Sequence, residues 1–199
     1  MSTERFLASA VVPYLAFVQQ AAAQTNPPII QQQANATGNF SVYQNHPYGF
    51  RLEYPSNWIL FNDTQLDEQN NAFAYFRSAQ TGSDFEIHVY PSAAASSLQQ
   101  FTTNRTNYLQ QQFGATPTTP NSTSVAGVPA NEIFFYLPGT QSAAAVTQVL
   151  MVNNDNGYIF TYIDPDISKY TMELPVIKEM INSFQPVSQQ RPSYTRPLT

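Results

Sequence analysis

The feature that most constrains the fold is a short segment in which apolar and charged side chains alternate. Phe50, Leu52 and Tyr54 occupy every second position. The charged residues Arg51 and Glu53 stand between them. Successive side chains of a strand point to opposite faces, so this two-residue period is typical of a strand that buries one face. The segment therefore predicts a sheet strand that lies against a hydrophobic core.

The residues around this strand define its ends, and similar segments follow it. Gly49 allows a sharp turn before the strand, and Pro55 should end it because proline has no backbone N–H to donate. Turn residues at 81–84 and 153–157 predict hairpins, with Gly157 expected at a positive φ. Hairpin links imply an antiparallel sheet. The further predicted strands are Trp58–Phe61, Ala72–Arg77, Phe85–Tyr90, Thr119–Val125, Ala130–Leu137, Ala145–Val152 and Tyr158–Ile163.

Two segments carry the 3.6-residue apolar period of amphipathic helices. The first covers about 97–113, with a serine to cap its start and Gly114 in the position of a left-handed C-terminal cap. The second covers about 174–183, with Pro175 in its first turn. These helices separate and follow blocks of strands. The chain is therefore expected to form one α+β domain in which helices flank a central antiparallel sheet.

Several of these residues together resemble the PsbP-like family, extracytoplasmic domains related to an extrinsic subunit of photosystem II. The matching positions are Tyr43, residues 48–50, residues 54–58 and the pair 183–184 at the end of the last helix, with Pro175 earlier in that helix. The resemblance spans the domain and implies an α/β/α sandwich. It also implies a non-catalytic role outside the cytoplasm. The motif marks a folding core rather than a site.

The chain departs from the family in its surface. It lacks the Lys-rich surface that plant members use to dock onto photosystem II, and its middle is rich in Gln and Asn. The resemblance therefore does not imply photosynthesis. No metal-binding residues are carried over from the family, because no His/Asp cluster aligns.

The ends of the chain predict export. Arg5, an apolar run over 6–18 and small residues at 21–23 resemble a secretory signal, the alternative being an amphipathic or buried helix. Polar, Pro-containing tails lie on both sides of the domain. The expected division is a signal peptide at 1–23, a disordered linker at 24–39, a PsbP-like domain at 40–185 and a disordered tail at 186–199. The mature protein is then secreted or extracytoplasmic, without a transmembrane span, and peripheral to the outer membrane face.

Asn-x-Ser/Thr sequons accompany this expected location. They are glycosylation candidates only in a host that modifies Asn, and otherwise they are ordinary surface residues. The candidate acceptors are Asn35, Asn39, Asn62, Asn104 and Asn121.

Charge and cysteine content exclude several classes of function. The formal net charge is −5 and only 11% of residues are charged. No Lys/Arg stripe is available to neutralise phosphates, so nucleic acid is not expected as a partner. The chain has no Cys, which excludes disulfides, thiolate metal sites and a catalytic thiol.

The weak metal candidates are Glu86, His88 and His46. On the segment 85–90, alternation predicts Glu86 and His88 on the outward face, where they would supply half of a Zn²⁺ or Mn²⁺ site. His46 would have to converge on them, and the alternative is that both His are surface residues. No cofactor is expected.

Catalytic motifs are missing from the sequence, so we expect no enzymatic activity. The carboxylates Asp164 and Asp166 are close enough for acid–base chemistry, but a turn before the last helix is the simpler interpretation. The favoured function is a module that binds or stabilises a partner protein at the extracytoplasmic membrane face or cell envelope. The alternatives are a small-ligand or metal-binding protein and a hydrolase.

Overall fold

The computed structural model describes residues 40–46, 48–61, 72–90, 97–137, 143–153 and 156–187. The expected signal peptide and linker, and the tail beyond residue 187, lie outside the described residues. So do three of the sequon asparagines, Asn35, Asn39 and Asn62.

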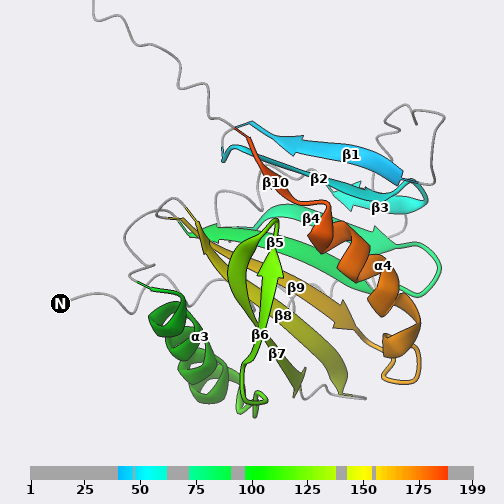
Figure 1. The fold of residues 1–199 in the computed structure, drawn as a ribbon. Helices are drawn as coiled ribbons and strands as arrows, with labels where there is room; N and C mark the ends of the chain where they lie inside the picture. Colours follow the sequence, from blue (N-terminus) through cyan, green and yellow to red (C-terminus); the bar gives the residue numbers. More distant parts are fainter. Residues whose placement is uncertain are drawn as a thin grey trace, which may run out of the picture.

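A seven-stranded antiparallel sheet forms the centre of the domain (Figure 1). Its order is β3-β4-β5-β9-β8-β7-β6, so consecutive strands are neighbours except where β9 lies beside β5. The predicted hairpins join β4 to β5 and β8 to β9. The strands are β3 (Trp58–Phe61), β4 (Ala72–Ser78), β5 (Asp84–Tyr90), β6 (Asn121–Val125), β7 (Val128–Leu137), β8 (Ala144–Asn153) and β9 (Asn156–Asp164).

A second, three-stranded sheet lies beside the β4 side of the large one (Figure 1). It consists of β1 (Phe40–Asn45), β2 (Phe50–Pro55) and β10 (Gln185–Pro186). The alternating segment is β2, whose residues are alternately buried and exposed as predicted. The strand β10 was not predicted. It pairs with β2 and brings the end of the domain back to its beginning.

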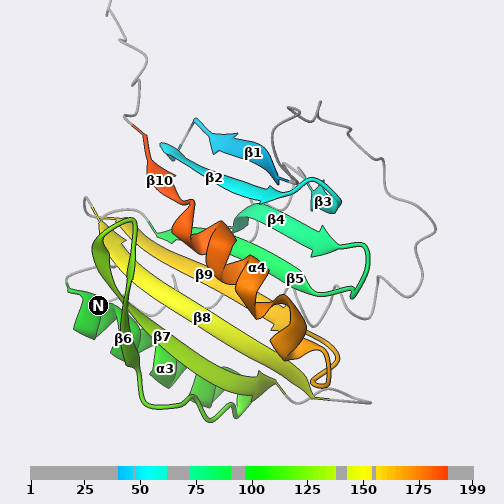
Figure 2. The same cartoon turned by 45° about the vertical axis from the view of Figure 1, so that its right-hand side comes forward.

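Two helices lie on opposite faces of the seven-stranded sheet (Figure 2). The helix α3 (Leu98–Phe113) begins at Ser97, whose side chain accepts from the backbone N–H of Gln100, and Gly114 ends it at φ 61°. The helix α4 (Tyr170–Asn182) begins a turn earlier than its apolar period predicts. Pro175 is therefore inside this helix rather than in its first turn, which corrects the expectation. The expected α+β class is confirmed.

The family motif forms the hydrophobic core beneath α4. Phe184 stacks on Phe50 at 5.5 Å between ring centroids and meets the edge of Phe160 at 5.0 Å. Tyr43, Tyr54, Trp58 and Phe76 belong to the same buried cluster. The motif therefore holds the small sheet, the large sheet and the end of α4 together, as a folding core should.

The turn glycine of the β8–β9 hairpin has a different role from the one predicted. Gly157 is not among the glycines with positive φ; it lies in β9, opposite Val152 and Tyr90. A Cβ at this position would come within 2.7 Å of the Phe101 ring. The missing side chain therefore lets α3 approach the sheet closely.

Strand β5 is buried on both faces, which corrects the prediction that Glu86 and His88 lie on an outward, solvent-facing side. The side chains at 85, 87 and 89 point into the core, where they share a cluster with residues of α4. The face that carries Glu86, His88 and Tyr90 is covered by the other helix, α3. A two-residue period identifies the two faces of a strand, but it does not reveal that a helix covers the polar one.

Candidate functional site

The face of the sheet beneath α3 carries a buried layer of polar side chains. A ring nitrogen of His88 (Nε2) lies 2.9 Å from a carboxylate oxygen of Glu86. From α3, Arg105 donates through Nε to the Oε1 of Gln148 on β8 at 2.9 Å. The amide of Gln148 donates in turn to Thr161 on β9 at 3.1 Å. We call these five residues the polar layer.

Arg105 links the polar layer to α3, and its side chain is fully buried. Burial lowers the pKa of Arg105, and it raises the pKa of the neighbouring Tyr90. Within the described part of the chain, the Nη1 of Arg105 and the hydroxyl of Tyr90 have no hydrogen-bond partner. The negative charge of Glu86 opposes this lowering of the Arg105 pKa. Unpaired buried donors are costly, so this layer is not optimised for stability alone.

The structure brings Glu86 and His88 together and leaves His46 elsewhere. His46 is exposed and follows β1 in the small sheet, with Gln44 at 3.5 Å from its Nδ1. His88 is only 2% exposed. Among the described residues, no group of three or more His, Cys, Asp or Glu could hold a metal ion. The two residues on β5 remain a candidate pair for a metal.

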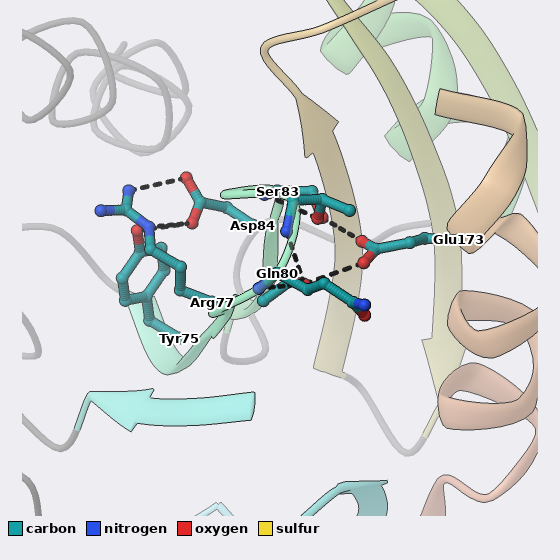
Figure 3. Close-up of polar contacts among 8 residues, drawn as sticks. Tyr75, Arg77, Gln80, Ser83, Asp84 and Glu173 are labelled. Carbon is teal, nitrogen blue, oxygen red and sulfur yellow. Dashed lines mark hydrogen bonds and ion pairs between the residues drawn. The ribbon is translucent and has the colours of Figure 1, made fainter. Parts of the chain in front are cut away.

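A second ionisable cluster joins the two strands of the β4–β5 hairpin (Figure 3). The carboxylate of Asp84 accepts from Arg77 at 2.7 and 3.0 Å and from the hydroxyl of Tyr75 at 2.7 Å. The Arg77 guanidinium also lies 5.9 Å from the ring of Phe61. Burial raises the pKa of Asp84 to about 6, although both hydrogen-bond donors oppose that rise. The geometry is that of a closed structural pair.

The same hairpin is tied to the start of α4 (Figure 3). One carboxylate oxygen of Glu173 accepts from Ser78 at 2.8 Å, and the other accepts from Ser83. An acidic residue in the first turn of a helix also complements the helix dipole. Glu173 is therefore occupied in fixing α4 to the sheet.

The carboxylates considered for acid–base chemistry form the turn before α4. Asp164 is buried and accepts from the hydroxyl of Tyr162 at 3.0 Å and from the backbone of Asp166 at 2.8 Å. Asp166 is exposed and pairs with Lys169 at 3.0 Å. The turn was predicted correctly. The burial of Asp164 was not foreseen.

A hollow of about 320 Å³ lies between α4 and the β6 side of the sheet. Val149 of β8 and Ile181 of α4 form its apolar part. Its polar side chains come from β6, β7 and α4, namely Asn121, Thr123, Ser124, Glu132, Lys178 and Asn182. We call this hollow the α4–β6 groove. Among the described residues, neither Lys178 nor Glu132 has an ion-pair partner.

Aromatic side chains continue from the groove along β7. The ring of Phe134 lies 4.9 Å from Tyr136 and 5.3 Å from Tyr170 of α4. The hydroxyl of Tyr170 is hydrogen-bonded to the hydroxyl of Thr147. Tyr136 is 50% exposed. An exposed Tyr is a residue type that is enriched at binding surfaces.

The two described sequons occupy different surroundings. Asn104 lies within α3, where its side chain accepts from Gln100 at 2.7 Å. Asn121 is exposed at the start of β6 and lines the α4–β6 groove. Glycosylation at either position stays a prediction.

Sequence reasoning missed the residues that organise these sites. Arg105 is the one cation of α3 and is buried, whereas the exposed residues of this helix are mainly Gln, Asn and Thr. Its position four residues after Phe101, on the buried stripe, was the available signal. Lys178 lies next to Ile177, which is buried, and gave no comparable signal.

Comparisons with known proteins show similarity in structure and not in sequence. No family model and no curated protein matches the chain. Cyanobacterial PsbP (CyanoP) from Synechocystis has a similar structure, with a TM-score of 0.58 and 10% identity over 78% of this chain and 98% of that one. The Ran-binding protein Mog1p of Saccharomyces cerevisiae gives 0.53 and 9%, over 76% and 97%.

A third similar structure is LpqN, involved in cell envelope biogenesis of Mycobacterium tuberculosis. Its TM-score is 0.51 at 7% identity, over 90% of this chain and 98% of LpqN. Identities of this size show a common fold only. The described helices include none that is long and apolar enough to cross a membrane. The chain has the PsbP-like α+β fold that its aromatic motif predicts.

Proposed function

We propose that this protein is a non-catalytic module that binds a partner protein at the extracytoplasmic membrane face or cell envelope. The observation that carries the proposal is the distribution of its polar groups. The buried ionisable clusters are committed to internal contacts, as in the pairs of Asp84 with Arg77 and Glu173 with Ser78. Two charged side chains without a described ion-pair partner, Lys178 and Glu132, instead line the α4–β6 groove. The half-exposed Tyr136 lies four residues beyond Glu132 on the same strand.

The structural neighbours support this class of function. One is named for binding Ran and another for a role in cell envelope biogenesis. The expected export of this chain fits the second. The carboxylates of a hydrolase, Asp164 and Asp166, do not line the groove.

Affinity capture from envelope and membrane fractions of the native source tests the proposal. Two single substitutions of equally exposed apolar residues serve as a matched pair. Tyr136→Ser is on β7, four residues beyond Glu132 of the groove, and Val42→Ser is on the small sheet; the native residues are 50% and 51% exposed. A truncated hot-spot aromatic residue typically costs at least 2 kcal/mol of binding. We expect one specific protein with the native chain and with Val42→Ser, and a strong loss with Tyr136→Ser.

Two results would count against the proposal. One is the absence of any specific protein in the captured material. The other is an equal loss for both variants, which would place the binding surface elsewhere. Mass spectrometry of the native chain from the same preparation reports its mature N-terminus and any glycans, and an intact leader on protein inside the cell would contradict export.

A further inference from the structure

We propose that an extended segment of the partner pairs with the outer edge of β6 and places an acidic side chain in the α4–β6 groove. This inference rests on the proposed function and specifies the chemistry of the partner. It follows from the open edge of β6, from the way in which the chain closes the neighbouring edge, and from the hydrogen-bonding groups that line the groove.

The first observation is the edge itself. In the seven-stranded order β6 is the last strand, and no described strand lies beyond it. Its residues from Asn121 to Ser124 are all exposed. Edge strands are usually protected against pairing with foreign strands by charged residues, especially Lys, or by Pro. The sequence Asn-Ser-Thr-Ser-Val has none of these.

The second observation is that the chain protects the adjacent edge of β7. Strand β6 pairs with β7 only as far as Glu132. Beyond that point, the backbone N–H of Thr118 donates to the carbonyl of Phe134 at 2.8 Å. The backbone N–H of Phe134 donates to the hydroxyl of Thr118 at 3.1 Å. One part of this side of the sheet is therefore closed by the chain, whereas no described strand pairs with the outer edge of β6.

The third observation is the chemistry of the groove. Five of its six polar side chains can donate a hydrogen bond to a carboxylate, namely one ammonium group, two amides and two hydroxyls, and the sixth is itself a carboxylate. Lys178 faces the hollow without a described ion-pair partner. A side chain with an apolar stem beside Val149 and Ile181 and a carboxylate near Lys178 would match this lining. Strand addition supplies affinity through the backbone, and such a pocket supplies specificity.

Binding of synthetic peptides to the full chain tests the inference. The probes are ten-residue peptides in which Thr and Val alternate and one position is Glu, Gln or Lys. That position is moved along the peptide, so that every register is sampled. We expect the Glu peptides to bind about tenfold more tightly than the Lys peptides. Bound Glu peptides should protect the amides of residues 121–125 against hydrogen exchange. The variant Lys178→Gln should remove the preference, and Lys169→Gln, with the same charge change on an exposed turn, should keep it.

A proline pair tests the edge directly. Neighbouring residues of a strand direct their N–H groups to opposite sides, so one of Ser122→Pro and Thr123→Pro faces β7 and the other faces outward. The variant that keeps the native melting temperature should lose peptide binding. Retained binding in that variant, a preference for Lys peptides, or no protection of β6 by any peptide would overturn the inference. A partner that the native chain still captures, and that Tyr136→Ser loses while Val42→Ser keeps it, would then leave the proposed function intact.

Discussion

The two faces of the seven-stranded sheet differ in the way they are covered. On the α4 side, aromatic rings from both sheets and Phe184 form a continuous apolar cluster. The α3 side has an apolar cluster at its β7–β8 end. The rest of that side carries the polar layer and the pair of Asp84 and Arg77. In Figure 2, α4 lies in front of one part of its own face of the sheet, whereas β6 and part of β7 lie to one side of the helix.

This difference separates stability from recognition. Burial of aromatic area on the α4 side provides non-directional stabilisation. The polar layer on the α3 side provides less net stabilisation, because buried charges lose hydration, but its hydrogen bonds fix the position of the helix. The α3 face is thereby closed. Among the described residues, the α4 face carries a hollow and an uncovered strand, and we propose it as the face that a partner contacts.

The largest effect is expected from truncation in the aromatic cluster. Phe184 is 1% exposed and contacts the rings of Phe50, Tyr158 and Phe160. Phe184→Ala should lower the free energy of unfolding by about 3–5 kcal/mol, since it leaves a cavity where the two sheets meet. Urea denaturation measures this change. A loss below about 1 kcal/mol would mean that the apolar face does not dominate stability.

The polar face should add a pH dependence that the aromatic face lacks. Burial raises the pKa of Asp84 to about 6 from 3.8, so folding favours its protonated form. Its contribution to stability is then fully present below pH 3.8 and is lost as the pH rises through about 6. The decline is at most about 3 kcal/mol. Denaturation curves from pH 4 to 7 should show that Asp84→Asn removes it.

A second Asp provides the control of opposite sign. Hydrogen bonds from Ser168 and Lys169 lower the pKa of the exposed Asp166. Its contribution is present above the ordinary Asp pKa and is lost as the pH falls through the lowered value. Asp166→Asn should therefore leave the decline between pH 4 and 6 unchanged. If both variants flatten the curve equally, Asp84 is not the group that titrates.

The polar layer should respond as a connected unit. Arg105→Met leaves the Oε1 of Gln148 without its donor and should cost about 1–3 kcal/mol. The double substitution Arg105→Met with Gln148→Leu removes both groups and should recover most of that loss. Thermal and urea denaturation of the cycle measure the coupling. Additive losses would show that the contact does not act as a unit.

The close approach of α3 gives the smallest expected effect. A methyl group at Gly157 would meet the ring of Phe101, so Gly157→Ala should cost about 1–2 kcal/mol. Shortening the facing side chain in the pair Gly157→Ala with Phe101→Leu should relieve the clash. If the clash is relieved, the double variant loses less unfolding free energy than the sum of the losses measured for Phe101→Leu and Gly157→Ala alone.

The sequence predicted the strands because alternation and hairpin residues are local signals, and β2 and β5 carry them clearly. It did not predict that Glu86 and His88 are buried, because a polar strand face looks the same beneath a helix as beneath water. The start of α4 was missed because Lys169 offers no side-chain cap. Gly157 was assigned to turn geometry, although its role depends on Phe101, which is distant in the sequence.

The candidate groove could not be predicted, since it exists only through tertiary packing. Asn121 and Lys178 are far apart along the chain. They line the same hollow because β6 is the last strand of the sheet and α4 packs on one face of that sheet. The aromatic motif gave the fold from a few residues. The charges to which we assign recognition, Lys178 and Glu132, lie outside that motif.

Hydrogen exchange of the full chain, alone and bound to the partner captured from its native source, tests the central claim most directly. The account predicts increased protection at residues 121–125 of β6 and at 174–182 of α4, with no change along the exposed side of α3. Protection confined to α3, or spread over the small sheet with β6 unchanged, would contradict it.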